Sequence, residues 1–139
     1  MTLHLIKLSV GSEDVDSLVS WQAGRLKRHG EIWHGTRMRP KRGAELLEGG
    51  SIYWVIRGLV QCRQALLDLE EAEDESGRPY TRLMLDPEMV RVVPRAQRPF
   101  QGWRYLTADR APRDLTSTSG DAKDLPPALW AELRDLGLM

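Results

Sequence analysis

The sequence predicts an α+β fold, in which helices lie early and late in the chain and antiparallel strands lie between them. Three observations support this prediction. Apolar residues recur at helical spacing over residues 15–26, they alternate with period two over residues 52–57, and five or six short strands follow one another in 139 residues. That many strands would curl into a small, mostly antiparallel, partly closed β-barrel, with an N-terminal helix, a short helix and a C-terminal helix.

The first strand and the first helix are defined by their ends. Residues 3–10, LHLIKLSV, are rich in Leu, Ile and Val and predict a largely buried strand that Gly11 breaks. Ser12 or Asp14 can cap a helix that continues to Gly30, the expected left-handed stop. The apolar stripe of this helix is Val15, Leu18, Val19 and Leu26, with Trp21 beside it.

A short helix and a strand follow. Residues 31–38 read as a strand or extended segment, and Pro40 fits the first turn of a helix because its missing N–H would be unpaired there anyway. The helix covers residues 41–50, KRGAELLEGG, and ends at its two glycines. Residues 51–58, SIYWVIRG, alternate as a strand does, and Gly58 allows a tight turn.

The centre of the chain predicts an antiparallel meander. Residues 59–70 are interpreted as a strand because they alternate and lie between two strands, although QALLDLEEAED has high helix propensity. Residues 80–86 and 88–93 are two further strands. Residues 94–106 are expected to be irregular because of Pro94 and Pro99.

The last part of the chain is expected to be a surface loop over residues 107–124 followed by the C-terminal helix over residues 125–139. Asp124 is its candidate N-cap, and its apolar stripe is Leu129, Leu133 and Leu136.

Length and composition limit the classes of protein to consider. The 139 residues are expected to form a single domain, and 41% hydrophobic with 29% charged residues is ordinary for a globular protein. No apolar run approaches the roughly 20 residues of a membrane span, and the N-terminus lacks a basic leader and a cleavage site. The lone cysteine, Cys62, fits a reducing cytoplasm, so we expect a cytoplasmic protein.

The net charge is zero, with 20 basic and 20 acidic residues, but the charges are segregated. Residues 25–42 hold seven basic residues and one acid, and residues 89–106 hold four arginines and no acid. The acids gather in residues 68–75, DLEEAEDE. A protein of zero net charge can therefore still carry a basic face, and a polyanionic partner is not excluded.

No residue pattern favours an enzyme. Cys62 lies in a predicted buried strand, where burial raises the pKa of a thiol and makes it inert. No glycine-rich phosphate loop is present, and His4, His29 and His34 do not have metal-ligand spacing. We therefore predict no catalytic residue, no metal site and no cofactor, while leaving an enzymatic activity open.

The basic stretches supply the candidate site. Arg37, Arg39, Lys41 and Arg42 surround the start of the short helix, where free N–H groups attract phosphate. Aromatic residues among arginines also suit nucleic acid, because bases stack on rings beside a cationic groove. The predicted phosphate-binding residues are Arg37, Arg39, Lys41, Arg42, Arg57, Arg98, Trp103 and Arg104.

Each of these features has a plainer interpretation. The basic residues would then only keep a surface soluble, and the tryptophans would be core or half-buried anchors, as we expect of Trp21, Trp54 and Trp130. The same interpretation is favoured for Trp33 and Trp103. A binding surface requires residues 37–42 and 95–104 to meet around an exposed indole.

Two resemblances follow from these segments. MTLHLIKLSVG, RMRPKRGAELLEGGSIYWVIRGLVQCRQALLDLE and LDPEMVRVVPRAQRPFQGWRYL resemble an uncharacterised bacterial single-domain family of about this length, which implies no activity. Proline, short helix, glycine and strand in succession are also similar to the ASCH branch of the PUA-like superfamily, small β-barrels that often bind RNA or nucleotide-like ligands. The Lys-Thr and the glutamate of the ASCH motif are absent after Gly50, and Arg57 is the residue that answers to its arginine.

The leading hypothesis is a non-enzymatic RNA- or nucleic-acid-binding module that uses the basic face. One alternative is a protein that binds or modifies a nucleotide-like small ligand in a pocket at the barrel mouth. Another is a protein-interaction subunit, with exposed aromatic residues and the terminal leucine stripe as its contact surface. The sequence leaves the oligomeric state open.

Overall fold

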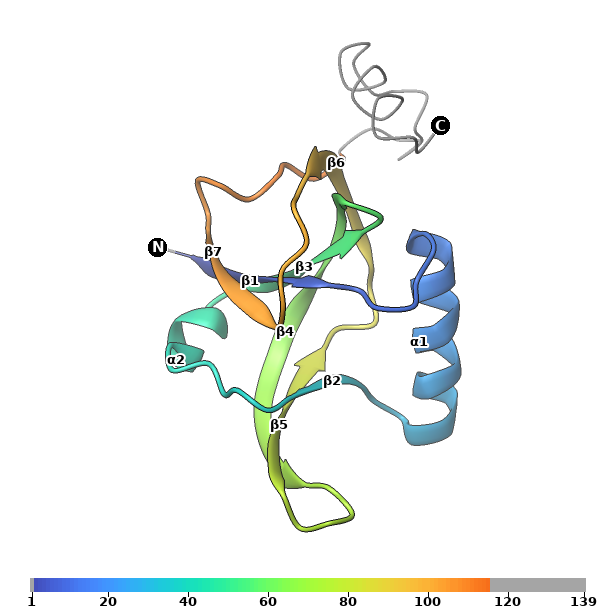
Figure 1. Cartoon of the computed structure of the whole chain (residues 1–139), viewed down its shortest axis with the longest axis vertical. Helices are drawn as coiled ribbons and strands as arrows, with labels where there is room; N and C mark the ends of the chain where they lie inside the picture. The colour runs from blue at the N-terminus through green and yellow to red at the C-terminus, as the bar shows by residue number, and fades with distance from the viewer. Residues whose placement is uncertain (1, 116–139) are drawn as a thin grey trace.

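The computed structural model describes residues 2–115 and contains seven strands and two helices (Figure 1). In chain order they are β1 (Leu3–Leu8), α1 (Val15–His29), β2 (Ile32–Thr36), α2 (Gly43–Leu46), β3 (Ser51–Ile56), β4 (Leu59–Glu73), β5 (Pro79–Leu85), β6 (Val90–Ala96) and β7 (Trp103–Thr107). The predicted C-terminal helix, Trp130 and the end of the predicted surface loop lie outside the described residues.

The strands form one mixed sheet in the order β2-β5-β4-β3-β1-β7, with β6 paired to β4 beside this path. β1 and β3 are parallel and the other pairs are antiparallel. Within residues 2–115 the two end strands, β2 and β7, do not pair with each other, so the sheet is open and the predicted closure into a barrel is not confirmed. The α+β prediction holds in the coarser form of a mostly β structure with two helices.

β4 is the longest strand and connects the two ends of the molecule (Figure 1). Its first half pairs with β3 and β6, and its second half pairs with β5. The alternation of buried and less buried side chains from Val60 to Leu66 shows that the period-two pattern outweighs the helix propensity of residues 64–74. The turn from β3 is tight because Arg57 and Gly58 both have left-handed φ angles, 53° and 79°.

α1 begins and ends as the sequence predicts. The Asp14 carboxylate accepts a hydrogen bond of 2.7 Å from the Ser17 N–H, and Gly30 ends the helix with a φ of 75°. Val15, Leu18 and Gln22 face the sheet. The prediction that Trp21 is a core or half-buried residue is wrong, because Trp21 lies beside this stripe and is 53% exposed.

Two segments differ from their predictions. α2 is a single turn over Gly43–Leu46 and not a helix over residues 41–50. Residues 94–106 are not irregular throughout, since β6 continues through Pro94 and β7 begins at Trp103. Pro94 is tolerated because β4 is the one named strand that pairs with β6, and the short bridge on the other side of β6, Val92 to Asp114, does not include Pro94.

The sheet has an apolar cluster on each face. The larger cluster packs under α1 and includes Leu5, Ile52, Trp54, Leu83 and Trp103, and the smaller one includes Ile6, Tyr53, Val60, Val92 and Phe100. Neither described helix is long and apolar enough to cross a membrane. The site described next lies between α1 and the larger cluster.

Candidate functional site

A pocket of about 400 Å³ opens between α1 and the sheet, next to the loop that joins β1 to α1. Its aromatic walls are Trp21 from α1, Trp33 and His34 from β2, and Trp54 from β3. Its polar groups are the side chains of Ser9, Ser12, Ser17 and Gln22. Residues from four separate elements thus converge on this volume, which is in the range of small-molecule sites.

A buried hydrogen-bond network holds the inner wall of the pocket. The amides of Gln22 and Gln64 form a reciprocal pair, with N···O distances of 2.7 and 2.6 Å. The Trp54 indole N–H donates to Gln64 Oε1 at 2.9 Å, and Gln64 Nε2 also donates to the Asp86 carbonyl at 3.0 Å. Because Gln22 lies on α1 and Gln64 on β4, the network fixes the helix and the Trp54 ring relative to the sheet.

His34 lies edge-on to Trp54, with ring centroids 5.4 Å apart and an interplanar angle of 80°. Burial lowers the pKa of His34 to about 4, and the charges of Lys7 and Arg25 add to this effect. The imidazole is therefore neutral at pH 7. Among residues 2–115 neither ring nitrogen of His34 has a hydrogen-bond partner.

Three cations surround the aromatic walls. The guanidinium carbon of Arg25 lies 4.3 Å from the Trp33 ring centroid and 5.2 Å from that of Trp21. Arg82 lies 4.5 Å from the Trp33 centroid. Lys7, half-buried in β1, has a pKa that burial lowers.

Within the described part of the chain, Lys7, Arg25 and Arg82 form no ion pair with an acid. Arg25 Nε is also buried without a hydrogen-bond partner there. Cationic groups therefore lie beside the aromatic walls of the pocket without an ion-pair partner among residues 2–115.

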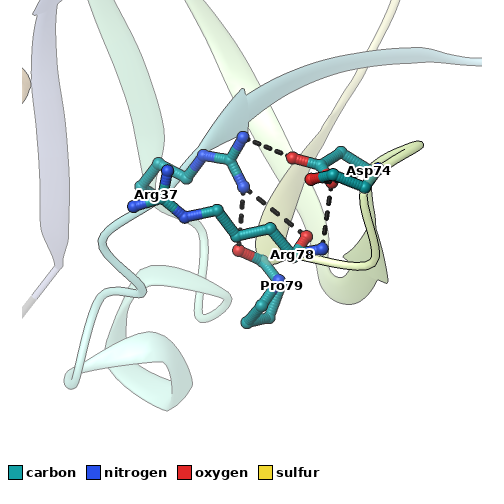
Figure 2. A network of polar contacts seen from close by, with 5 residues as sticks. Arg37, Asp74, Arg78 and Pro79 are labelled. Atoms are coloured by element: carbon teal, nitrogen blue, oxygen red, sulfur yellow. Dashed lines mark hydrogen bonds and ion pairs between the residues drawn. The ribbon is translucent and has the colours of Figure 1, made fainter.

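Most of the sequence-predicted arginines near α2 are, by contrast, paired internally. Figure 2 shows Arg37 reaching Asp74 at 2.6 Å and the backbone carbonyls of Arg78 and Pro79 at 3.5 and 3.2 Å. Arg39 pairs with Glu71, and Arg42 pairs with Glu45 at 2.5 Å. The acidic run 68–75 thus lies against part of the first basic segment.

The two basic segments meet in part. Trp103 Nε1 donates to the Met38 carbonyl at 2.8 Å, and the Arg42 backbone N–H donates to the Tyr105 hydroxyl at 3.1 Å. Trp103 is only 8% exposed, so its indole belongs to the core and is not a free stacking surface. The plainer interpretation of Trp103 as a core residue is confirmed.

The remaining predicted residues lie on the surface but do not form one group. Lys41, Arg57, Arg98 and Arg104 are exposed, and Arg104 stacks on Phe100 at 4.7 Å. Arg57 occupies the β3–β4 turn, whereas Arg37 contacts the β4–β5 hairpin at the other end of β4. That these residues bind phosphate or nucleic acid stays a prediction.

The pocket residues were not selected from the sequence. The sequence favours Trp21 and Trp33 as core or half-buried anchors, and it presents His34 as a histidine without metal-ligand spacing and as an aromatic residue before the first basic cluster. One signal was present: Trp21 and Arg25 are four residues apart on α1, off its apolar stripe, where a ring and a cation meet on a helix surface. Cys62, by contrast, is buried as predicted, and burial raises its pKa to about 12.

Fold and site together define a mixed-sheet α+β protein with an aromatic pocket between its long helix and the sheet. A family model described as "Protein of unknown function (DUF1489)" matches residues 5–139, nearly the whole chain, and the chain belongs to this family. No solved structure matches the chain.

Proposed function

We propose that the protein binds a small ligand with a flat ring, of the nucleotide type, in the pocket between α1 and the sheet. The observation that carries the proposal is the convergence of Trp21, Trp33, Trp54 and His34 on a volume of about 400 Å³. Aromatic side chains provide faces on which a heterocyclic ring stacks, and such stacking contributes roughly 1–3 kcal/mol per base. The serine hydroxyls at the β1–α1 loop offer donors and acceptors to the polar part of such a ligand.

Trp21 is the wall that best suits a stacking role. It is exposed, although a tryptophan of a helix usually packs against its own sheet, and it borders the pocket from the solvent side. The exposed ring of Trp21 leaves apolar surface in water, and a ligand ring stacked on it would bury that surface. Trp54, in contrast, is buried and hydrogen-bonded, and serves as the fixed inner wall.

The experiment is a thermal-shift screen of the four common nucleosides and their 5′-monophosphates, followed by calorimetric titration of those that raise Tm. Mass action raises Tm for any ligand that binds the folded state alone. Trp21→Ala should weaken binding at least tenfold, because it removes one stacking face while leaving the core intact. Leu67→Ala, which truncates another exposed apolar side chain outside the pocket, is the matched control.

The proposal fails if none of the eight compounds raises Tm, or if a compound that does so binds Trp21→Ala and the unaltered protein equally well.

A second candidate is the binding of RNA or another nucleic acid on the basic face, without catalysis. The contacts from Met38 and Arg42 to β7 favour it, because they bring the two basic segments together. The exposed cations Arg98 and Arg104 would contact phosphates. Filter binding of single- and double-stranded RNA should then fall steeply as salt rises, and the double substitution of Arg98 and Arg104 to Gln should flatten that slope.

Absence of binding at low salt removes this second candidate. A nucleic-acid complex that is insensitive to Trp21→Ala would place its site outside the pocket. The partly closed, PUA-like barrel predicted from the sequence also remains a proposal, as does a role as an interaction subunit, whose leucine stripe lies outside the described residues.

A further inference from the structure

The pocket has a cationic side that stacking alone does not explain. Lys7 follows Leu3 and Leu5 along the same face of β1, toward the larger apolar cluster, because alternate residues of a strand share a face. Its Cα lies opposite that of Trp54 in the β1–β3 ladder, and the Trp54 ring contacts His34. Lys7 is not itself a lining residue, but it lies next to two residues that are, Leu8 in the chain and Trp54 across the ladder.

Among the described residues, the charges that act on His34 are positive. The charged groups that act on its ring are Lys7 from β1 and Arg25 from α1. Its neighbours on β3 and β5, Trp54 and Leu83, carry no charge. Lys7 is half-buried, and Arg25 Nε is buried with no hydrogen-bond partner in residues 2–115, so a counter-charge beside them would stabilise both cations.

The start of α1 does not supply an alternative anion site. The Asp14 carboxylate already accepts the free Ser17 N–H, and Asp16 in the first turn adds a second negative charge. The positive side of the pocket is therefore the wall at His34, on which the charges of Lys7 and Arg25 act.

We propose that the ligand of this pocket is an anion, that its charged group lies among Lys7, His34 and Arg25, and that His34 takes up a proton when the ligand binds. This inference rests on the proposed function, since it assumes that the pocket holds a small ligand. Lys7 and Arg25 supply the charge that recognises the anion. When the anion binds, the His34 imidazole takes up a proton.

The direction of the proton exchange follows from the charges. In the free protein the pKa of His34 is about 4, so roughly 3% of the imidazole is protonated at pH 5.5. A bound anion offsets Lys7 and Arg25 and raises the pKa of His34, because an opposite charge nearby favours the imidazolium. Affinity for the anion therefore rises as pH falls from 7 to about 5, and this dependence ends below pH 4, where free His34 is already protonated.

The test compares neutral and anionic versions of the same ring. The four nucleosides and their 3′,5′-cyclic monophosphates are titrated calorimetrically at pH 5.5 in two buffers of different ionisation enthalpy. A phosphodiester keeps its single negative charge between pH 5 and 8, whereas a phosphomonoester titrates near pH 6, so any proton uptake belongs to the protein. We expect at least one cyclic nucleotide to bind tenfold or more tightly than its nucleoside and to take up nearly one proton.

Variants assign the effect to residues. Lys7→Met should reduce affinity for the cyclic nucleotide about tenfold and leave that for the nucleoside unchanged. His34→Gln should abolish the proton uptake. Arg110→Gln, which removes an exposed cation outside the pocket, is the matched control and should change neither. In the unaltered protein, the NMR titration of the His34 ring, assigned with His4 and His29 variants, should shift to higher pH when ligand is present.

The outcomes separate the two proposals. If a nucleoside and its cyclic nucleotide bind equally, or if proton uptake persists in His34→Gln, the anionic site is refuted while stacking in the pocket stands. If neither kind of compound binds, the proposed function falls and the anionic site falls with it.

Discussion

Substituting Gln64 by leucine tests whether the buried amide network holds α1 against the sheet. Gln64 is 0% exposed and takes part in four hydrogen bonds, to Gln22 twice, to Trp54 and to the Asp86 carbonyl. Leucine fits the volume but leaves the three partners without their bonds. At a net contribution of about 1 kcal/mol for each neutral hydrogen bond, the free energy of unfolding should fall by about 4 kcal/mol.

The companion variant Gln22→Leu removes only the reciprocal pair and should cost about 2 kcal/mol. The double variant should be less unstable than the sum of the single ones by about 1–2 kcal/mol, because both remove the same two bonds. Urea unfolding followed by tryptophan fluorescence measures all four proteins of the cycle. Strict additivity, or a loss below about 1 kcal/mol for Gln64→Leu, would refute the reasoning.

Three further predictions concern stability. Asp114→Asn should lower the free energy of unfolding by about 1 kcal/mol at pH 7, because the bidentate ion pair of Asp114 with a β4 arginine is half-buried. This contribution is present above the unfolded pKa of the carboxyl and is lost as pH falls through its lowered folded pKa. Asp16→Asn, whose side chain is 85% exposed in its ion pair, should change the free energy of unfolding little in urea titrations. Gly50→Ala should cost about 3 kcal/mol or more in thermal unfolding, since its Cβ would lie 2.3 Å from two carbonyl oxygens, while Gly24→Ala in open helix should gain about 0.5–1 kcal/mol. Because the folded pKa of His34 lies below the unfolded value of 6.5, protonation of His34 should lower the free energy of unfolding by about 2 kcal/mol between pH 7 and 5. His34→Gln should not show this loss, and equal losses in the two proteins would contradict the prediction.

The local elements of the fold could be predicted because each is determined by a short pattern. The cap at Asp14 and the stop at Gly30 define α1, and alternation over residues 51–70 defines two strands and the turn between them. β7 was missed because its five residues lie beyond two prolines, and five residues give little room for a periodic signal.

The topology could not be predicted by the same means. β1 pairs in parallel with β3 across more than 40 residues that contain α1, β2 and α2, and β6 returns to β4 and not to its chain neighbour β5. These pairings are chosen by the packing of faces between distant segments. A one-dimensional pattern records which side of a strand is apolar, but it does not record which other strand covers it.

The charge pattern does not show which cations have acidic partners, for a related physical reason. A run of like charges attracts attention in a sequence, yet it also attracts opposite charge in the fold, and Arg37 and Arg39 lie against the acidic run of β4 and its hairpin. The cations left without an acid in residues 2–115 around the pocket are instead single ones, far apart in the chain.

Within residues 2–115, Lys7, Arg25 and Arg82 form no ion pair, although Glu70 lies opposite Arg82 in the β4–β5 ladder. The two guanidinium groups lie over aromatic rings, and Lys7 lies opposite Trp54 in the β1–β3 ladder. Rings stabilise a guanidinium by cation–π contact without cancelling its charge. The arrangement therefore keeps a positive potential available beside an open cavity, and a flat anion would satisfy the rings and the charges together.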